Sequence, residues 1–512
     1  MALPRVALSE ANDDAGARSS APACLSQAFL SSWRSYSKLI LSLQTVKKHN
    51  GSLSRRIESI PKNHTGIGVK ILRLHLHDEN TCFPHIDRWL KFAVTPGIEE
   101  LTLVTPFIYR KYSFPCSVLS VGVRNSIRSL HLDTCVFRAT ADLGLFRSLT
   151  SLRLHSVSIT GDELECLLSN SLALERLDLK DCREIVSLKI PSVLQRIEEL
   201  NLHLPKHNLT CSVLSVGVRN SIRSLQLDTC VFRPTAELGP LRSLTSLRLC
   251  SVCITGGELE CLLSNSLALE RLDLEDCREI VSLKIPSVLQ RLSYLLVDGC
   301  YAMQIIENKA PSISNFTLFG RLIKLLLGEA SQTIKLLNLF AATAAGYARA
   351  KLLSIMPNLE TLSLSSSHEE NTPMLPSKFV NLKYLNIQIT SSTLSPSYVY
   401  SSLISFLDAS PSLETWWLEV PLADMGHELV GSSDLRELPE RRHDHLKSME
   451  ISGFHSTKSL VELTCCIVKS AVSLESLTLD TIRGAPCCFD GLGLPYSKFM
   501  VEQASRAVHW WL

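Results

Sequence analysis

Apolar residues recur along most of this chain with a fixed internal spacing. In each unit they occupy positions 1, 4 and 6, and position 9 is often cysteine, as in Ile127, Leu130, Leu132 and Cys135. The alternation predicts a short β-strand whose positions 4 and 6 point inwards, while positions 5 and 7 face solvent. Position 1 recurs in steps of 22 to 29 residues, at Ile98, Ile127, Leu149, Leu174, Ile197, Ile222, Leu244, Leu269 and Leu292.

Part of this array is duplicated. Residues 116–196 return as residues 211–291 with nine differences in 81 positions, and the motif at residues 98–101 returns at 197–200. This pattern is the signature of leucine-rich repeats, whose units bury their apolar faces only by stacking. We therefore expect an α/β leucine-rich-repeat solenoid, curved, with a parallel sheet on its concave face and helices and turns on its convex face.

Elements outside the duplication follow from the same pattern. We expect an earlier strand within residues 69–76 and later ones within 359–364, 382–387, 413–418, 446–451 and 474–479. Thr160 and Glu163 form a capping-box pattern before an apolar helical face, and Thr255 with Glu258 repeats it. The Leu- and Ala-rich residues 325–355 predict one or two inserted helices, and residues 422–445 predict a loop.

Composition excludes several classes of protein. A net charge of +2 gives no electrostatic signature of a nucleic-acid-binding protein, and a hydrophobic content of 45% argues against general disorder. No stretch approaches the roughly 20 apolar residues that cross a bilayer. The N-terminal residues lack a signal-peptide pattern, and the 17 cysteines follow the repeats and not a disulfide framework. We expect a cytoplasmic or nuclear protein with reduced cysteines, without nucleic-acid or membrane partners.

Motifs of catalysis are absent from the sequence. It has no phosphate-binding glycine loop, zinc helix or nucleophile elbow, so we expect no enzyme and no cofactor. Cys250 and Cys253 form a C-x-x-C pair that could bind metal or cycle its redox state, but no second pair accompanies it, and we interpret both as incidental. The position-9 residues Cys135, Cys182, Cys230 and Cys277 are expected in the core. No metal site is predicted.

Positions 5 and 7 of the strands supply the candidate contact residues. In the duplicated region these are His131, Asp133, Arg153, His155, Asp178, Lys180, Gln226, Asp228, Arg248, Cys250, Asp273 and Glu275. The two histidines could contact a partner or be merely solvated. Between the copies His131 becomes Gln226, His155 becomes Cys250 and Lys180 becomes Glu275, through neutral drift or to present different charges to one extended partner. Trp416 is expected inside and Trp417 outside, where it could anchor a partner.

Several segments resemble plant F-box/leucine-rich-repeat proteins. Residues 23–34 resemble the last helix of an F-box, and residues 63–70, 89–101 and 161–168 resemble other parts of that family. Residues 445–454 and 460–479 resemble the FBD module that closes many members. The family's F-box opens with Leu-Pro-Glu-Asp and an apolar helix. Here Leu3, Pro4 and Arg5 precede a polar run, so the box is truncated at its N-terminal half.

The resemblance implies a function. In the family, the F-box binds the Skp adaptor of an SCF ubiquitin ligase and the repeats hold the protein to be ubiquitinated. Leu25, Phe29 and Trp33 share one helical stripe that would contact the adaptor, or would instead cap the first repeat. We expect a non-catalytic substrate receptor with a protein target on the concave face. The alternatives are a ligase-independent binding scaffold and a face that holds a small polar ligand.

The expected organisation has five parts. They are a poorly ordered N-terminus, 1–22; a remnant F-box-like helix or N-terminal cap, 23–45; the repeat array, 66–420, with the duplication 98–196/197–291; FBD-like terminal repeats, 445–482; and a C-terminal tail, 483–512.

Overall fold

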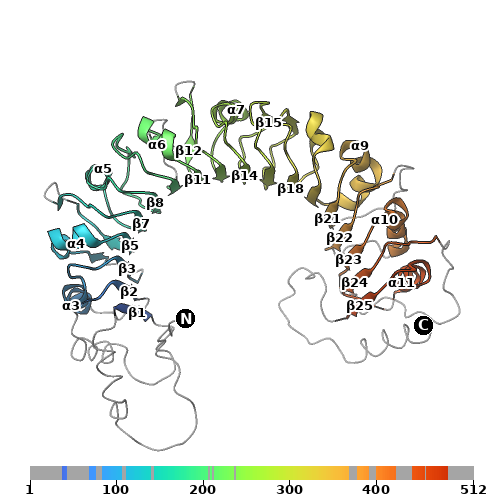
Figure 1. Ribbon diagram of the computed structural model, residues 1–512, viewed down its shortest axis with the longest axis horizontal. Helices are drawn as coiled ribbons and strands as arrows, with labels where there is room; N and C mark the ends of the chain where they lie inside the picture. Colours follow the sequence, from blue (N-terminus) through green and yellow to red (C-terminus); the bar gives the residue numbers. More distant parts are fainter. Residues whose placement is uncertain are drawn as a thin grey trace, which may run out of the picture. The chain divides into compact units, whose positions relative to one another are not determined.

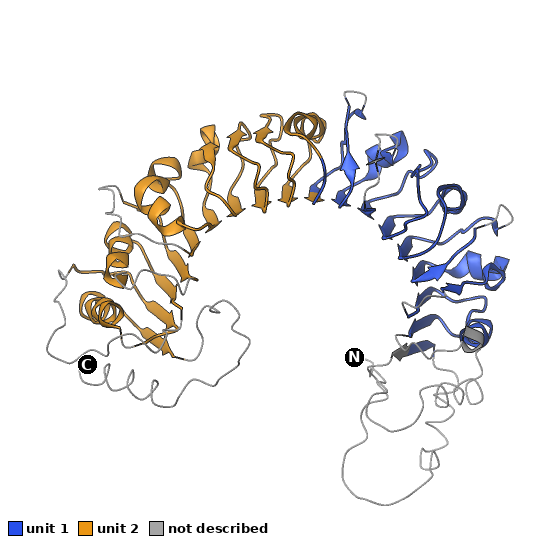
Figure 2. Cartoon of the chain, turned by 180° about the vertical axis from the view of Figure 1, so that it is seen from behind, with its two compact units in different colours: residues 1–247, 251–253 blue, residues 248–250, 254–512 orange. Residues whose placement is uncertain are grey.

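The computed structural model forms two compact units (Figure 2). Unit 1 comprises residues 1–247 with 251–253, and unit 2 comprises residues 248–250 with 254–512. The structure describes residues 37–42, 68–76, 83–106, 111–139, 143–205, 208–209, 213–235, 238–367, 378–390, 399–421, 441–455 and 457–481.

Parallel strands form the framework of unit 1 (Figure 1). They are β1 (Lys38–Ser42), β2 (Ile71–His75), β3 (Glu100–Val104), β5 (Ser129–Asp133), β7 (Ser151–His155), β8 (Arg176–Lys180), β9 (Glu199–His203) and β11 (Ser224–Asp228). Each pairs in parallel with its neighbour in this order. The register aligns equivalent motif positions, so that Leu130 lies opposite Leu152 and Leu152 opposite Leu177. Side chains of one motif position therefore form rows across the sheet.

Unit 2 has the same design. Its parallel strands are β14 (Arg271–Glu275), β16 (Tyr294–Asp298), β18 (Asn315–Phe319), β20 (Leu336–Phe340), β21 (Thr361–Ser366), β22 (Tyr384–Ile389), β23 (Thr415–Glu419), β24 (Ser448–Ser452) and β25 (Ser476–Asp480). The residues of β13 (Ser246–Cys250) are divided between the two units.

Helices and short strands return the chain on the opposite side of each unit's sheet (Figure 1). The helices are α3 (Phe83–Ala93), α4 (Val121–Ser126), α5 (Gly161–Ser169), α6 (Val216–Ser221), α7 (Gly256–Ser264), α8 (Ala344–Tyr347), α9 (Leu353–Ile355), α10 (Ile404–Ala409) and α11 (Lys458–Ser470). The short strands are β4 (Tyr112–Ser113), β6 (Cys135–Val136), β10 (Asn208–Leu209), β12 (Val231–Phe232), β15 (Ser282–Ile285), β17 (Ile305–Asn308) and β19 (Lys324–Leu326). Single turns of 3₁₀-helix span Cys116–Val118, Gly328–Gln332 and Tyr400–Leu403, and a π-helical turn spans Ala348–Leu352.

The predicted capping boxes are confirmed. Thr160 accepts a hydrogen bond from the Glu163 backbone N–H, and the Glu163 side chain accepts one from the Thr160 backbone. Thr255 and Glu258 repeat both bonds at α7. Each box satisfies two backbone donors that would otherwise lack partners at the start of the helix, which fixes where the return segment becomes helical.

The motif leucines form the core between the sheet and the return segments. Leu130 and Leu132 are fully buried, and Leu225 and Leu227 are at most 2% exposed. The chain then turns sharply at position 8, where six of the described residues other than glycine have φ between +50° and +57°: Thr134, Ser156, Asp181, Thr229, Ser251 and Asp276. This left-handed turn is costly for a residue with a Cβ, and in later repeats glycine supplies it, as at Gly299 and Gly453.

Position 9 follows that turn and returns to the core. Cys135, Cys182, Cys230 and Cys277 are at most 1% exposed, as predicted. Burial raises the pKa of the Cys135 thiol to about 12, so the sulfur stays protonated and behaves as a small apolar group.

One expectation about local structure is wrong in part. The sequence pattern predicts helix over residues 325–355, but β20 runs through their centre and helix begins only at Ala344. The apolar run around Leu336 fits both the period of an α-helix and the period of a β-strand, and its pairing with β18 favours the strand. For the segment 23–45 we expect a remnant F-box-like helix or an N-terminal cap; of this segment the structure describes residues 37–42, where Lys38–Ser42 is a strand paired with β2. Residues 1–36 and 422–440 and the tail from 482 lie outside the described residues, as do Leu25, Phe29 and Trp33.

Candidate functional site

The face of each sheet opposite the core carries the side chains of motif positions 5 and 7. We call it the open face. In unit 1, position 5 contributes Arg73, Thr102, His131, Arg153, Asp178, Asn201 and Gln226, and position 7 contributes His75, Val104, Asp133, His155, Lys180, His203 and Asp228. Ile40 of β1, which lies opposite Arg73, and Val104 are apolar; the other residues named here are polar or charged, and the face is rich in histidine.

Carboxylates accompany the histidines of unit 1. The Nδ1 atom of His203 lies 2.8 Å from Asp228 Oδ2, and its Nε2 atom lies 3.4 Å from Asp181 Oδ1. The Nε2 atom of His155 lies 3.2 Å from Asp178 Oδ2. All of these side chains are partly exposed, so the pairs position the rings more than they stabilise the fold.

His131 has a different environment from the other open-face histidines. Its ring lies 4.9 Å from the His155 ring, centroid to centroid, and it is half-buried. Desolvation lowers the pKa of His131 to about 4, and the proximity of His155 and Arg153 acts in the same direction. His131 is therefore neutral at neutral pH and keeps one unprotonated ring nitrogen.

In unit 2 the open face also includes motif position 3, which alternates with positions 5 and 7, and there a charged group lies beside an aromatic ring. Arg248 contacts Glu275 at 2.9 Å, and Arg271 Nε contacts Asp273 Oδ2 at 2.8 Å. The Arg271 guanidinium also lies 3.9 Å from the centre of the Tyr294 ring, a cation–π contact. Asp273 is only 5% exposed, so a partner would reach Arg271 rather than the carboxylate.

Aromatic side chains continue along the same face. Phe319 and Phe340, at position 7 of β18 and β20, stack with centroids 4.1 Å apart and planes 5° from parallel. Trp417 is 36% exposed, and its Nε1 atom donates to Ser452 Oγ at 3.3 Å, whereas Trp416 is fully buried. The predicted orientations of the two tryptophans are confirmed. Tyrosine, tryptophan and arginine are the residue types that most often dominate protein–protein binding energy.

The structure places all the predicted contact residues of the duplicated region at strand positions 5 and 7. Lys180 is exposed, while His131, Asp133 and His155 are half-buried together at one place. These three are also the residues that could hold a metal ion. Cys250 and Cys253 are not in a disulfide, and within the described residues neither belongs to a metal-binding group.

Sequence reasoning missed Tyr294, Phe319 and Phe340. A signal existed: Ile313, Phe316 and Leu318 occupy motif positions 1, 4 and 6, and Ile334, Leu337 and Leu339 do the same. Phe319 and Phe340 then fall at position 7. The sequence interpretation lost the pattern after Leu292 because the intervals between repeats became shorter and the helical period fitted residues 325–355 as well.

Comparisons with known proteins identify the repeat family. No curated protein matches the chain. Three solved structures resemble it weakly. A leucine-rich-repeat protein of Leptospira interrogans has 15% identity and a TM-score of 0.38, and the match covers 94% of this chain and 97% of that one. TLR13 in its complex with ssRNA13 has 15% identity and a TM-score of 0.37, with 80% of this chain and 69% of that one covered; a TDR receptor has 14% identity and a TM-score of 0.33, with 83% and 78% covered.

In the described part of the chain, no helix has the length and apolarity to span a bilayer.

A protein-family model matches most of the chain. The model described as At1g61320/AtMIF1, LRR domain, matches residues 60–204 and 195–510. The matched region spans both units and contains all the strands from β2 to β25. The chain therefore belongs to the At1g61320/AtMIF1 leucine-rich-repeat domain family.

Proposed function

We propose that this chain is a non-catalytic recognition protein that binds a protein target on its open face. The observation that carries the proposal is two pairs of side chains on the open face of unit 2: Arg271 with Tyr294 near the start of β14 and β16, and the stacked Phe319 and Phe340 at the end of β18 and β20. The repeat motif requires apolar residues only at positions 1, 4, 6 and 9. The aromatic side chains at open positions are therefore not needed for the core.

The chemistry of this group fits a protein surface. The stacked phenylalanines offer a large rigid apolar area, and the separate Arg271, beside Tyr294, can bind a carboxylate or stack on a ring of the partner. Its strands pair in parallel, so the side chains are held at fixed spacing before a partner arrives, which lowers the entropic cost of binding.

The open face can be tested with matched variants. Phe340→Ser should abolish capture of partner proteins from plant extract while leaving the melting temperature within a few degrees of the parent value. Val288→Ser is the control, because Val288 is an exposed apolar residue of unit 2 outside the open face. If the parent, Phe340→Ser and Val288→Ser all capture the same set of proteins, the proposal is contradicted.

We further propose that the chain acts as the substrate receptor of an SCF ubiquitin ligase. Support comes from the sequence resemblance of residues 23–34 to an F-box helix and of residues 445–479 to the FBD module. The structure describes β24, α11 and β25 in the second segment. The alternative is a scaffold without ligase function, favoured by the polar sequence that replaces the first half of the F-box.

Adaptor binding separates these two functions. A pull-down with the Skp adaptor should recover the full-length parent, and Phe29→Ala should lose that binding if Leu25, Phe29 and Trp33 form the contact. No binding by the parent would support the scaffold, and unchanged binding by Phe29→Ala would remove this stripe from the interface. Neither result affects the test of the open face.

A further inference from the structure

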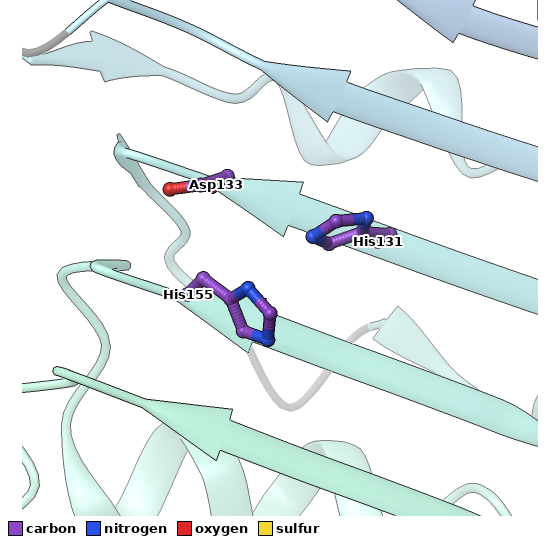
Figure 3. A group of neighbouring side chains, drawn as sticks. All are labelled: His131, Asp133 and His155. Carbon is purple, nitrogen blue, oxygen red and sulfur yellow. The ribbon is translucent and has the colours of Figure 1, made fainter. Parts of the chain in front are cut away.

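A group of three potential metal ligands lies on the open face of unit 1 (Figure 3). His131 and Asp133 occupy positions 5 and 7 of β5, and His155 occupies position 7 of β7. The parallel register sets Asp133 directly opposite His155. Two imidazoles and one carboxylate therefore converge from adjacent strands, and one ligand atom from each lies within 4.8 Å of the other two.

The two imidazoles are unusually short of partners. The Nε2 atoms of His131 and His155 are buried, and neither has a hydrogen bond within the part of the chain that the structure describes. For His155, Nε2 lies at ion-pair distance from Asp178 without the angle of a hydrogen bond. Leaving a buried polar atom unpaired costs about 1–3 kcal/mol. The packing that holds the His131 ring is therefore unfavourable without a further ligand, whereas the Nε2 atom of His155 faces the Asp178 carboxylate.

The surrounding groups suit metal binding. Figure 3 shows one ring nitrogen of His155 facing the strand of His131 and Asp133, and the other nitrogen, Nε2, faces Asp178. A carboxylate behind a ligating histidine fixes its orientation and increases its basicity. The Thr134 hydroxyl donates to Asp133 Oδ1 at 2.7 Å, which leaves Oδ2 available. Asp133 and Asp178 also offset the positive charge of Arg153, which is exposed beside the group.

We propose that His131, Asp133 and His155 form a binding site for a divalent transition-metal ion, with Zn²⁺ as the expected occupant. Imidazole with one carboxylate is a donor set for Zn²⁺ and its neighbours and not for Ca²⁺ or Mg²⁺, which prefer oxygen ligands alone. In a tetrahedral zinc site with bonds of about 2.0–2.1 Å, the ligand atoms are about 3.3 Å apart. In the metal-bound state, rotation of the three side chains on their two strands would bring the ligand atoms to this separation.

Three protein ligands leave the fourth tetrahedral position open. Because the group lies on the open face, this position would be directed to solvent, where water or a donor from a bound molecule can occupy it. This goes beyond the proposed recognition function and does not depend on it, because the ion would bind to the isolated chain.

The second copy of the duplication shows that the ligands are not needed for the repeat itself. At the equivalent positions it has Gln226, Asp228 and Cys250, so two of the three ligands are replaced while the core leucines are unchanged. This supplies a substitution that the repeat already accepts, His131→Gln. Asp133→Asn removes the carboxylate ligand with little change of shape.

The test is a Zn²⁺ titration by calorimetry of the full chain, first freed of metal with a chelator. The chain has 17 cysteines, which can also bind Zn²⁺, so the total amount of bound Zn²⁺ is not informative. The informative quantity is the one Zn²⁺ equivalent whose affinity changes in the variants. The parent should bind one equivalent whose affinity falls at least tenfold in His131→Gln and in Asp133→Asn. Zn²⁺ should also raise the melting temperature of the parent more than that of either variant, because the ion binds the folded state.

His203→Gln is the matched control. It removes an open-face histidine of the same unit whose two ring nitrogens already contact carboxylates. It should bind Zn²⁺ as the parent does. Equal stoichiometry and affinity for the parent, His131→Gln and Asp133→Asn would overturn the proposal, as would loss of the same equivalent in His203→Gln.

Discussion

At the scale of single residues, burial determines what each open-face side chain can do. Lys180 is exposed and remains a solvated charge, whereas His131, at an equivalent type of position, has a ring packed against His155. Desolvation is the largest cause of its lowered pKa, followed by His155; Arg153 also lowers it, and the nearby Asp133 and Asp178 act in the opposite direction. Neighbours on two other strands, β7 and β8, thus set the charge of this residue.

This environment makes the stability of the protein depend on pH. The folded-state pKa of His131 is about 4, below the usual value of 6.5, so between these values the unfolded chain binds a proton that the folded chain does not. The contribution of neutral His131 to the free energy of unfolding is fully present above about pH 6.5 and is lost as the pH falls towards 4. His131→Gln should lose less stability than the parent between pH 7 and pH 5, measured by urea unfolding with a chelator present. Parallel losses of stability in both proteins would be inconsistent with a neutral, partly desolvated His131 in the folded chain.

At the scale of elements, the helices that return the chain are placed by close backbone approach. Gly161 and Gly256 are the first residues of α5 and α7, and a Cβ at either position would overlap a backbone carbonyl oxygen, that of Ser187 or Ser282 respectively. At Gly257, one residue further along α7, no atom of the described residues lies within 4 Å of the place that a Cβ would take, and the first copy carries Asp162 there. The capping box thus starts a helix that lies directly against the next return segment.

Alanine substitutions should separate these neighbouring glycines. Gly161→Ala and Gly256→Ala should each lower the free energy of unfolding by about 1–3 kcal/mol, because the backbone must move to admit the methyl group. Gly257→Ala should be neutral or stabilising by up to about 1 kcal/mol, because alanine favours helix and nothing opposes it. Chemical denaturation of the three variants gives the comparison. A loss at Gly257 equal to that at Gly256 would show that helix propensity, and not close approach, governs this site.

At the scale of the whole molecule, the repeat architecture explains how the duplication was accepted. The register joins β3 to β5 in the same way as β9 to β11: Leu101 lies opposite Leu130, and Leu200 lies opposite Leu225. A set of complete repeats can therefore be inserted between two strands without changing the contacts that either strand requires. Since each repeat contacts mainly its neighbours, stability in such proteins is close to a sum of local terms.

The reverse operation should also be tolerated. Deleting residues 116–210 removes β5, β7, β8 and β9 with their return segments and places β11 after β3. We expect a chain that still unfolds cooperatively on heating, with a moderate fall in melting temperature from the lost neighbour contacts. Deleting residues 116–133 removes β5 but keeps the return segment that follows it, and should abolish cooperative unfolding. Circular dichroism at increasing temperature distinguishes the two deletion variants. Loss of cooperative unfolding in the longer deletion would refute the idea that complete repeats can be removed without disrupting the fold.

The sequence alone determined the features that depend on local spacing. Apolar residues at positions 1, 4 and 6 defined the strands, position 9 placed Cys135 and its equivalents in the core, and the capping pattern at Thr160 located α5. The same alternation indicated which side chains of each strand, Trp417 among them, face away from the core. These properties depend only on the period of a strand or helix, which can be recognised from the order of residues within one short segment.

Tertiary structure decided what lies across the strands. Parallel pairing joins residues far apart in the chain, so His131 meets His155, Arg271 meets Tyr294 and Phe319 stacks on Phe340. The spacing of residues along one strand contains no information about the side chain that the next repeat places beside it. The sequence around Leu336 fits both a strand and a helix, and pairing with β18 and β21 on its two sides favours the strand. Register and burial therefore created both candidate sites from residues that form no recognisable motif in the sequence.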